Sequence, residues 1–259
     1  MKKTKVIIPA LGILLLSTAA SVTGTVAWFS ANNKVTATDM KVNAVAESGI
    51  VISNGVVPEG ATAAVYSYTA AASVGQKTLK PASTADFSTW YHSTSDDPAH
   101  PRNVDPNNPQ AYEEINETNH YDIAEYRVQH NFWIRSSSPA ALSSSSLKIN
   151  GVTAARSLGD QDLSASLRVG IRIEGDTNKY IYAPVAGFTE SYSVAGTTTV
   201  APKASTVVTT STVTNIPANS VAGIEVNIFV WFEGEDDNCI SNNLKASLET
   251  LTVQVEFGY

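Results

Sequence analysis

The chain has 259 residues, one cysteine and a formal net charge of −7 at pH 7. A single cysteine excludes an intramolecular disulfide, and with it the class of small secreted scaffolds that depend on several disulfides. The acidic balance argues against nucleic-acid binding, which needs clustered Lys and Arg against phosphate. The length is sufficient for one large β domain or two smaller ones, each with its own core.

The first residues predict export from a bacterial cytoplasm. Lys2, Lys3 and Lys5 form a short cationic segment, and residues 6–29 contain no charged side chain. Positive residues stay on the cytoplasmic side while an apolar run enters the membrane, which is how an export signal works. We therefore expect a secreted or cell-surface protein whose only membrane contact is this N-terminal segment.

A cleavage site is predicted between Ala27 and Trp28. Thr25 and Ala27 are small residues at the −3 and −1 positions of that bond, and a signal peptidase favours small residues there. On this interpretation residues 1–27 are a signal peptide. The alternative is an anchor that is not cleaved, since about 20 apolar residues can cross a bilayer.

Alternation of apolar and polar residues is the main secondary-structure signal. It runs through residues 163–173, and residues 175–178 then supply the Gly, Asp and Asn of a turn. The same period of two recurs over 126–134, 224–232 and 251–257. This pattern predicts half-buried β-strands.

These strands predict an all-β fold, an antiparallel β-sandwich or jelly roll preceded by an N-terminal signal helix. We expect the β domain to span residues 39–259, with loop insertions at 96–110 and 189–214. The second insertion is rich in β-branched residues, which favours extended hairpin structure. Long strands within 122–136 and 220–233 are expected at the centre of the sheets, and the last strand is expected to end inside a sheet.

Helical periodicity is scarce. Only residues 105–118 and 242–250 are compatible with short helices.

The sequence contains no recognisable catalytic centre, and we expect the protein not to be an enzyme. No histidine lies in an H-E-x-x-H helix that would hold zinc, and no G-x-S-x-G elbow presents a serine. His130 shares the apolar parity of its strand, which predicts a packed, hydrogen-bonded histidine. Cys239 is expected to be a small buried residue. No cofactor is expected apart from calcium.

The candidate calcium ligands are Glu235, Asp236 and Asp237. Several carboxylates on one loop offer the oxygen ligands that calcium prefers, although the EF-hand spacing is absent. The alternative is a solvated turn after the strand at 224–232.

Aromatic side chains suggest a carbohydrate platform. Trp90 and Tyr91 precede a loop rich in Pro and Asp, and Trp133 and Trp231 have the parity opposite to the apolar rows of their strands. Tryptophans on an outer face could stack on sugar rings. Burial under the insertions or another subunit is the alternative.

The segment at 25–38 reads Thr-Val-Ala-Trp-Phe-Ser-Ala-Asn-Asn-Lys-Val-Thr-Ala-Thr and leads into a strand-like stretch. It resembles the signal-peptide junction of the camelysin/TasA-type matrix proteins of Gram-positive bacteria. The resemblance implies cleavage by an ER-type signal peptidase, a jelly-roll core, and extracellular fibres in which the freed N-terminus adds a strand to the next subunit. Members of this family have also been labelled peptidases.

Strand donation has a physical basis of its own. A short extended segment gains a row of main-chain hydrogen bonds when it docks on an open sheet edge. A head-to-tail contact of this kind generates a filament. Residues 28–38 are the expected donor, with Trp28 and Phe29 as anchors and Val35 next. The alternative is that they form a flexible leader or the first strand of their own domain.

Three functions follow in order of preference. The first is a structural protein of the cell surface or biofilm matrix, self-associating into filaments. The second is an adhesin or carbohydrate-binding domain that uses Trp90 and Tyr91. The third is a secreted metallopeptidase-like enzyme.

Overall fold

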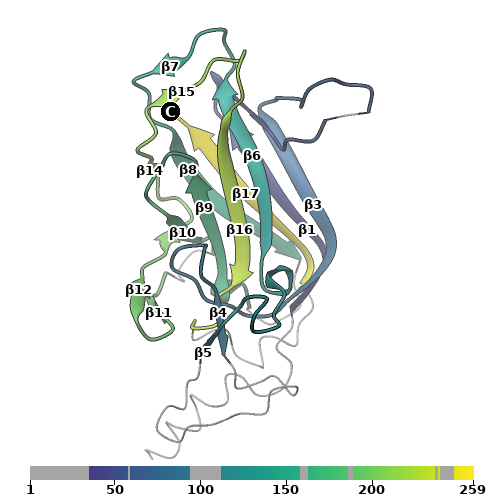
Figure 1. Cartoon of the computed structure of the whole chain (residues 1–259), viewed down its shortest axis with the longest axis vertical. Coiled ribbons are helices and arrows are strands. Elements are labelled where there is room, and N and C mark those ends of the chain that lie inside the picture. Colours follow the sequence, from purple (N-terminus) through teal and green to yellow (C-terminus); the bar gives the residue numbers. More distant parts are fainter. Residues whose placement is uncertain are drawn as a thin grey trace, which may run out of the picture.

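The structure is a computed structural model. It describes residues 35–57, 59–93, 112–157, 163–185, 189–236, 239 and 248–259. Almost all of its regular structure is β-strand, and the two larger sheets lie face to face (Figure 1). The predicted all-β class is confirmed, with the sheets arranged as a β-sandwich. The predicted signal helix lies outside the described residues.

Each layer of the sandwich has its own strand order. Sheet A runs β14 (Thr209–Thr210), β8 (Lys148–Ser157), β17 (Leu248–Gly258), β1 (Val35–Ala46), β3 (Thr69–Leu79). Sheet B runs β13 (Lys203–Ala204), β10 (Tyr180–Ala183), β9 (Leu167–Ile173), β16 (Ile224–Phe232), β6 (Val128–Ser136), β2 (Ile50–Ser53).

Short ribbons and turns complete the described part of the chain. The ribbons pair β4 (Tyr91–Ser93) with β5 (Tyr112–Glu114), β7 (Leu142–Ser143) with β15 (Asn215–Ile216), and β11 (Tyr192–Val194) with β12 (Thr198–Val200). Two 3₁₀ turns, η3 (Ile123–Glu125) and η4 (Leu163–Ser166), precede β6 and β9.

The last strand lies in the middle of sheet A. β17 runs antiparallel to β8 and parallel to β1, so that Val253 is paired with Ala154 on one side and Val42 on the other. The predicted placement of this strand inside a sheet is confirmed. Its backbone is therefore hydrogen-bonded along both edges.

β16 holds the equivalent place in sheet B. Ile228 is paired with Ile171 of β9 and His130 of β6, both antiparallel. The prediction of long central strands is confirmed for 224–232 and 128–136. It is wrong for 220–223, which precede β16, and for 122–127, where Asp122 accepts a hydrogen bond from the Ala124 amide and starts a 3₁₀ turn instead.

The predicted turn after residue 173 joins β9 to β10. Gly175 adopts a φ of 81°, which a side chain disfavours. Asp176 accepts hydrogen bonds from the Asn178 amide, the Tyr180 hydroxyl and the Thr212 amide and hydroxyl. The strand itself begins at Leu167 rather than at residue 163, because η4 occupies the first four positions.

The insertion at 189–214 forms β11, β12, β13 and β14, which confirms the expected extended structure. Ala195 and Gly196 both have positive φ at the tip of the β11–β12 hairpin, as a type I′ turn requires.

The insertion at 96–110 lies outside the described residues. The two regions that were compatible with short helices form none where they are described, because residues 112–114 form β5 and residues 248–250 begin β17.

Inward-facing apolar side chains of the two sheets form one core. Phe132, Ile228 and Val253 are each fully buried in it. Complete burial of such a side chain contributes roughly 1.5–3 kcal/mol to the free energy of folding. The interleaved inner faces therefore hold the two layers together.

We predict that Ile228→Ala lowers the free energy of unfolding by about 2–5 kcal/mol, because it opens a cavity at the centre of sheet B. Denaturant unfolding followed by circular dichroism measures the change. Val208→Ala is the matched control: Val208 is 57% exposed, so a change within about 0.5 kcal/mol is expected. Equal effects of the two variants would contradict this assignment of the core.

Candidate functional site

A rigid loop covers the lower outer face of sheet B. Thr84 accepts hydrogen bonds from the Asp86 and Phe87 amides, while Asp86 accepts them from the Ser88 and Thr89 amides. The indole of Trp90 donates to the Phe87 carbonyl at 3.1 Å. These bonds fix a tight loop that presents two aromatic rings to the sheet.

Those rings pack on aromatic side chains of β16. Phe87 stacks on Phe229 with ring centroids 4.9 Å apart, and Trp90 meets Trp231 edge-on at 5.3 Å. Gly170 of β9 makes this possible, since a Cβ there would lie 2.4 Å from the Phe87 ring. Trp90 and Trp231 are consequently buried within a second core and do not form a surface platform.

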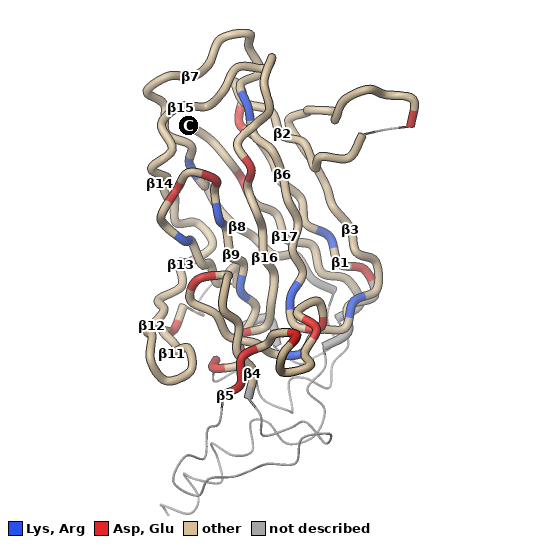
Figure 2. The backbone as a smooth tube through the Cα atoms, in the orientation of Figure 1, with Lys and Arg blue, Asp and Glu red and all other residues tan. Residues whose placement is uncertain are grey.

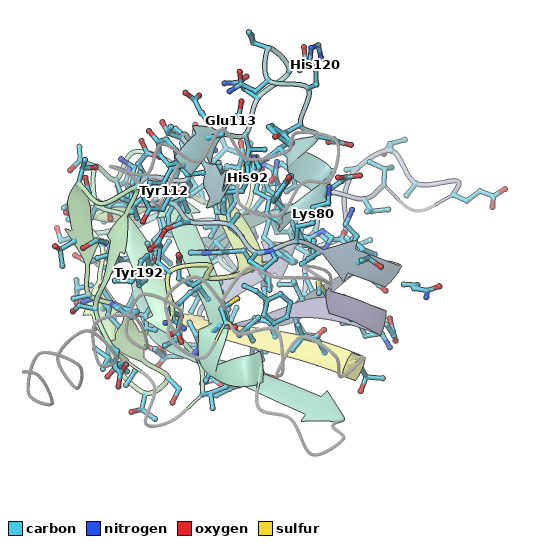
Figure 3. The ribbon with its side chains drawn as sticks, turned by 90° about the horizontal axis from the view of Figure 1, so that it is seen from below. Lys80, His92, Tyr112, Glu113, His120 and Tyr192 are labelled. Carbon is cyan, nitrogen blue, oxygen red and sulfur yellow. The ribbon has the colours of Figure 1, made fainter. Side chains whose placement is uncertain are left out.

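The histidines of the described part do not converge on one site. His92 is buried against the Tyr121 ring, with centroids 4.2 Å apart, whereas His120 lies on a loop away from it (Figure 3). His130 has the inward parity of β6, as predicted, and burial lowers its pKa. The expected hydrogen bond is not seen at its Nε2, which is buried and has no partner within the described residues. His100 lies outside the described residues.

A buried ionic cluster closes the lower end of β9 and β16. The Arg168 guanidinium is fully buried and forms an ion pair with Asp236. It also donates to the carbonyls of Ala165 and Leu167. Because removal of one partner leaves a buried charge unpaired, we expect this pair to be essential for the local fold.

Glu233 is the second buried carboxyl of this cluster. It accepts hydrogen bonds from the Trp231 indole at 3.0 Å and the Glu235 amide at 3.2 Å. Desolvation nevertheless raises its pKa to about 7. With Asp236 already neutralising Arg168, an ionised Glu233 adds an excess negative charge to the interior.

The predicted calcium ligands lie at this end of the molecule. Asp236 is engaged by Arg168, and Glu235 accepts a hydrogen bond from the Tyr112 hydroxyl at 3.2 Å. No group of three or more His, Cys, Asp or Glu side chains within the described ranges is arranged to hold a metal ion. Asp237 lies outside those ranges, so calcium binding stays a prediction.

Cys239 is buried beside this cluster. Burial raises the pKa of its thiol to about 12. A thiol that stays protonated at neutral pH is a poor nucleophile. The expectation of a small buried residue is confirmed.

We predict that Glu233 makes the protein less stable as pH rises. Its pKa is about 7 in the folded state against an ordinary 4.5, so the folded state binds more protons between these values. That contribution to the free energy of unfolding is complete below pH 4.5 and falls by up to roughly 3 kcal/mol by pH 7. Glu233→Gln removes this loss, so the variant is more stable than the parent at pH 8.

Thermal unfolding at several pH values measures this difference. Glu190→Gln is the control, because Glu190 is exposed. A Glu233→Gln variant whose stability follows the same pH profile as the parent would show that Glu233 does not titrate as stated.

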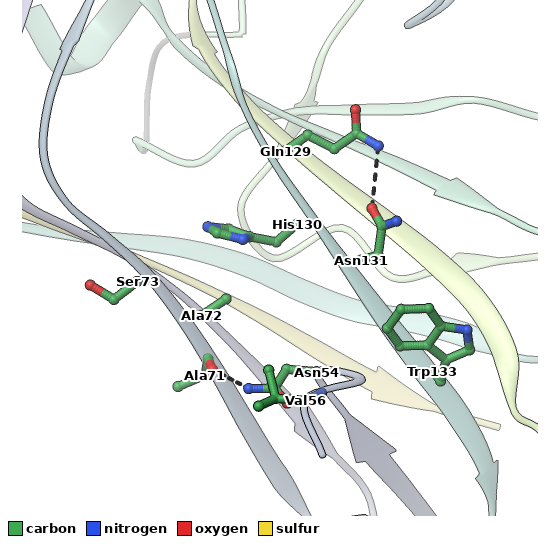
Figure 4. A pocket seen from close by; sticks show the side chains of 9 residues that line it. All are labelled: Asn54, Val56, Ala71, Ala72, Ser73, Gln129, His130, Asn131 and Trp133. Atoms are coloured by element: carbon green, nitrogen blue, oxygen red, sulfur yellow. Dashed lines mark hydrogen bonds between the residues drawn. The ribbon is translucent and has the colours of Figure 1, made fainter. Parts of the chain in front are cut away.

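An open pocket of about 670 Å³ lies on the opposite flank of sheet B, between β6 and β3 (Figure 4). Its lining residues are Asn54, Val56, Ala71, Ala72, Ser73, Gln129, His130, Asn131 and Trp133. None of these side chains is a carboxylate, lysine or arginine. Trp133 is partly exposed here, unlike Trp90 and Trp231.

The pocket exists because the strands on either side of it are not paired along their full length. β2 pairs with β6 only from Trp133 to Ser136, so residues 128–132 of β6 have no partner strand on that side among the described residues. β3 is the last strand of sheet A, and one of its edges is paired with no strand within the described ranges. Asn54 bridges part of the gap by donating to the Ala71 carbonyl at 2.9 Å.

The N-terminal assembly residues are only partly described. Val35 begins β1, where it is paired with Leu79 of β3. Residues 35–38 are therefore part of the domain's own sheet, four residues earlier than the expected start at 39. Ala27, Trp28 and Phe29 lie outside the described residues.

No protein-family model, curated protein or solved structure matches this chain. Among the residues that the structure describes, no helix is long and apolar enough to span a membrane.

Sequence reasoning missed two parts of this region. The parity of Trp133 places it opposite the apolar row of its strand, but the pocket around it depends on how far β2 extends along β6. The alanine-rich β3 has no regular alternation, so no pattern indicated the unpaired edge.

Proposed function

We propose that the chain is an exported bacterial structural protein of the cell surface or extracellular matrix, whose copies join by β-strand addition. The observation that supports this most directly is the unpaired edge of β3. The strand has eleven residues, and Asn54 already occupies the Ala71 carbonyl, so an added segment could form main-chain hydrogen bonds along the rest of this edge.

The upper part of the β3 edge lacks charge and proline, whereas Lys77 and an irregular register at Gly75 lie in its lower part. Natural edge strands carry charges or proline, or are short. Between Glu47 and Lys77 the only charged residue is Glu59, and Figure 2 shows the corresponding lack of colour along upper β3. This edge is therefore suited to contact with another chain.

Exposed apolar side chains lie on the same flank. The segment between β2 and β3 projects from the body beside β3 (Figure 1). It and the adjoining strand expose Val56, Val57, Val65, Tyr68 and Val74, by 37–61%. Apolar residues that gather on one side of a molecule indicate an interaction surface. A docked strand would cover part of them.

The donor that we propose is the segment before β1. Since β1 starts at Val35, residues 28–34 precede the domain's own strand, and Trp28 and Phe29 are the anchors available to them. A segment of one copy that docks on β3 of the next makes a heterologous contact, which extends into a filament when the rotation does not close. Cleavage after Ala27 would release this segment.

The sandwich is proposed to be a jelly roll. The chain crosses between the sheets from β8 to β9 and from β16 to β17, and the last two strands each enter the centre of one sheet. Such crossings are typical of jelly rolls. The parallel pairing of β1 with β17 is a departure from a purely antiparallel arrangement.

We predict that a protein starting at Trp28 forms filaments and that one starting at Val35 does not. The second version retains all of β1, so its fold is intact while the donor is absent. Negative-stain microscopy distinguishes the two outcomes, and circular dichroism confirms equal folding. Discrete particles from both proteins, or filaments from both, would contradict donation by residues 28–34.

We also predict that Val74→Lys prevents filament growth, because a lysine on an edge strand opposes the docking of another strand. Val74 is 37% exposed, so the domain should still fold. Val208→Lys is the matched control, being 57% exposed and close to β14 on the far margin of sheet A. Sedimentation of assembled protein measures the effect, and equal assembly of the two variants would place the contact elsewhere.

A further inference from the structure

We infer that the pocket between β6 and β3 binds a neutral carbohydrate. Its volume of about 670 Å³ lies within the range of small-molecule sites, roughly 300–1,000 Å³. The inference rests on the side chains of the pocket, whereas strand addition uses the backbone of β3. Ala71, Ala72 and Ser73 of β3 also line the pocket, so a docked strand and a sugar would compete for this space.

The lining determines the class of ligand. Every lining side chain is amide, hydroxyl, imidazole, aliphatic or aromatic, with no carboxylate, lysine or arginine. Burial lowers the pKa of His130, so its imidazole is uncharged at neutral pH. A site without charge gives no compensation for the desolvation of a phosphate, a sulfate or a metal ion. It suits a neutral polar ligand.

Trp133 supplies the apolar surface. Its backbone is held on both sides, by Ser53 of β2 and Glu225 of β16. Gly55, with a φ of +74°, packs against the indole so closely that a Cβ would lie 2.2 Å from Cζ3. The ring is therefore fixed before a ligand arrives. Sugar rings present C–H faces that pack on such aromatic surfaces, and a fixed ring loses little entropy on binding.

Polar groups near the Trp133 ring can form hydrogen bonds with the hydroxyl groups of a sugar. Gln129 donates to Asn131 through one amide hydrogen bond of 3.2 Å (Figure 4), which orients both side chains and leaves the Gln129 carbonyl and the Asn131 amino group without a partner in the described structure. His130 has the opposite strand parity, and its Nε2 is buried, so it lies away from these two amides. A hydroxyl both donates and accepts, so adjacent sugar hydroxyls can satisfy the Gln129 carbonyl and the Asn131 amino group.

On the wall opposite β6, the side chains of Asn54 and Ser73 already have hydrogen-bond partners within the protein. Asn54 donates to the Ala71 carbonyl and accepts from the Val56 amide at 3.0 Å. Ser73 donates to Asp39 at 3.2 Å. This wall therefore shapes the pocket, while recognition falls to Gln129, Asn131 and Trp133, which share one face of β6.

The test is a glycan array that carries neutral hexose and N-acetylhexosamine oligosaccharides beside sialylated and sulfated ones, probed with the protein from Trp28 to Tyr259. Isothermal titration with the strongest hit then gives its affinity. We expect binding to neutral glycans. Trp133→Ala should weaken it about tenfold or more, while Trp133→Phe should retain most of it.

Gln129→Ala serves as a second variant if Trp133→Ala does not fold, because Gln129 is exposed; a loss of several-fold is expected. Val208→Ala is the control that should bind as the parent does. The inference is overturned if no glycan binds, if only charged glycans bind, or if Gln129→Ala and the Trp133 variants bind with unchanged affinity. It is equally overturned if a synthetic peptide of residues 28–34, and no sugar, occupies the pocket.

Discussion

Burial of β16 on both of its faces is the constraint on which the rest of this structure depends. Inward residues such as Ile228 require a second sheet, and outward residues Phe229 and Trp231 require a second cover. Among the described residues, loops at 82–93 and 112–127 supply that cover. The edge of β6 at residues 128–132 has no strand beside it in this part of the chain, and the pocket lies between that edge and β3 of sheet A. On this account, packing at one end of the sandwich leaves the other flank available for contacts.

The buried ionic cluster is a costly element in this arrangement. Arg168 and Asp236 are far apart in the sequence, and their pairing ties the segment after β16 to β9. Buried ion pairs add little net stability, although loss of one partner is strongly destabilising. Glu233 adds a third ionisable group that gains a proton near neutral pH. We interpret the cluster as a device that fixes the position of the segment after β16 rather than as a source of stability.

The sequence predicts a strand wherever one face of that strand is apolar. β9, β16 and β17 were expected from their period of two, and Gly175 was expected in the turn after β9. The burial of Cys239 was also expected. These features depend on local alternation and turn chemistry, which a sequence displays directly.

Features that depend on distant residues were not predictable. The partner of Arg168 lies 68 positions away, and the cover over Trp231 comes from a loop more than a hundred residues earlier. The membership of Val35 in β1 depends on its pairing with Leu79. The sequence of β16 has one regular apolar row, and Phe229 and Trp231 lie between members of that row. The burial of this second face was therefore not evident from the pattern.

The most direct test of this account is amide hydrogen exchange across β3, compared between dispersed and assembled protein starting at Trp28. If copies join at this edge, amides of Thr69–Leu79 that exchange quickly in the dispersed protein become protected on assembly, while those of β17, paired on both sides, are protected in both states. Unchanged exchange in β3 on assembly, with new protection elsewhere, would contradict strand addition at this edge.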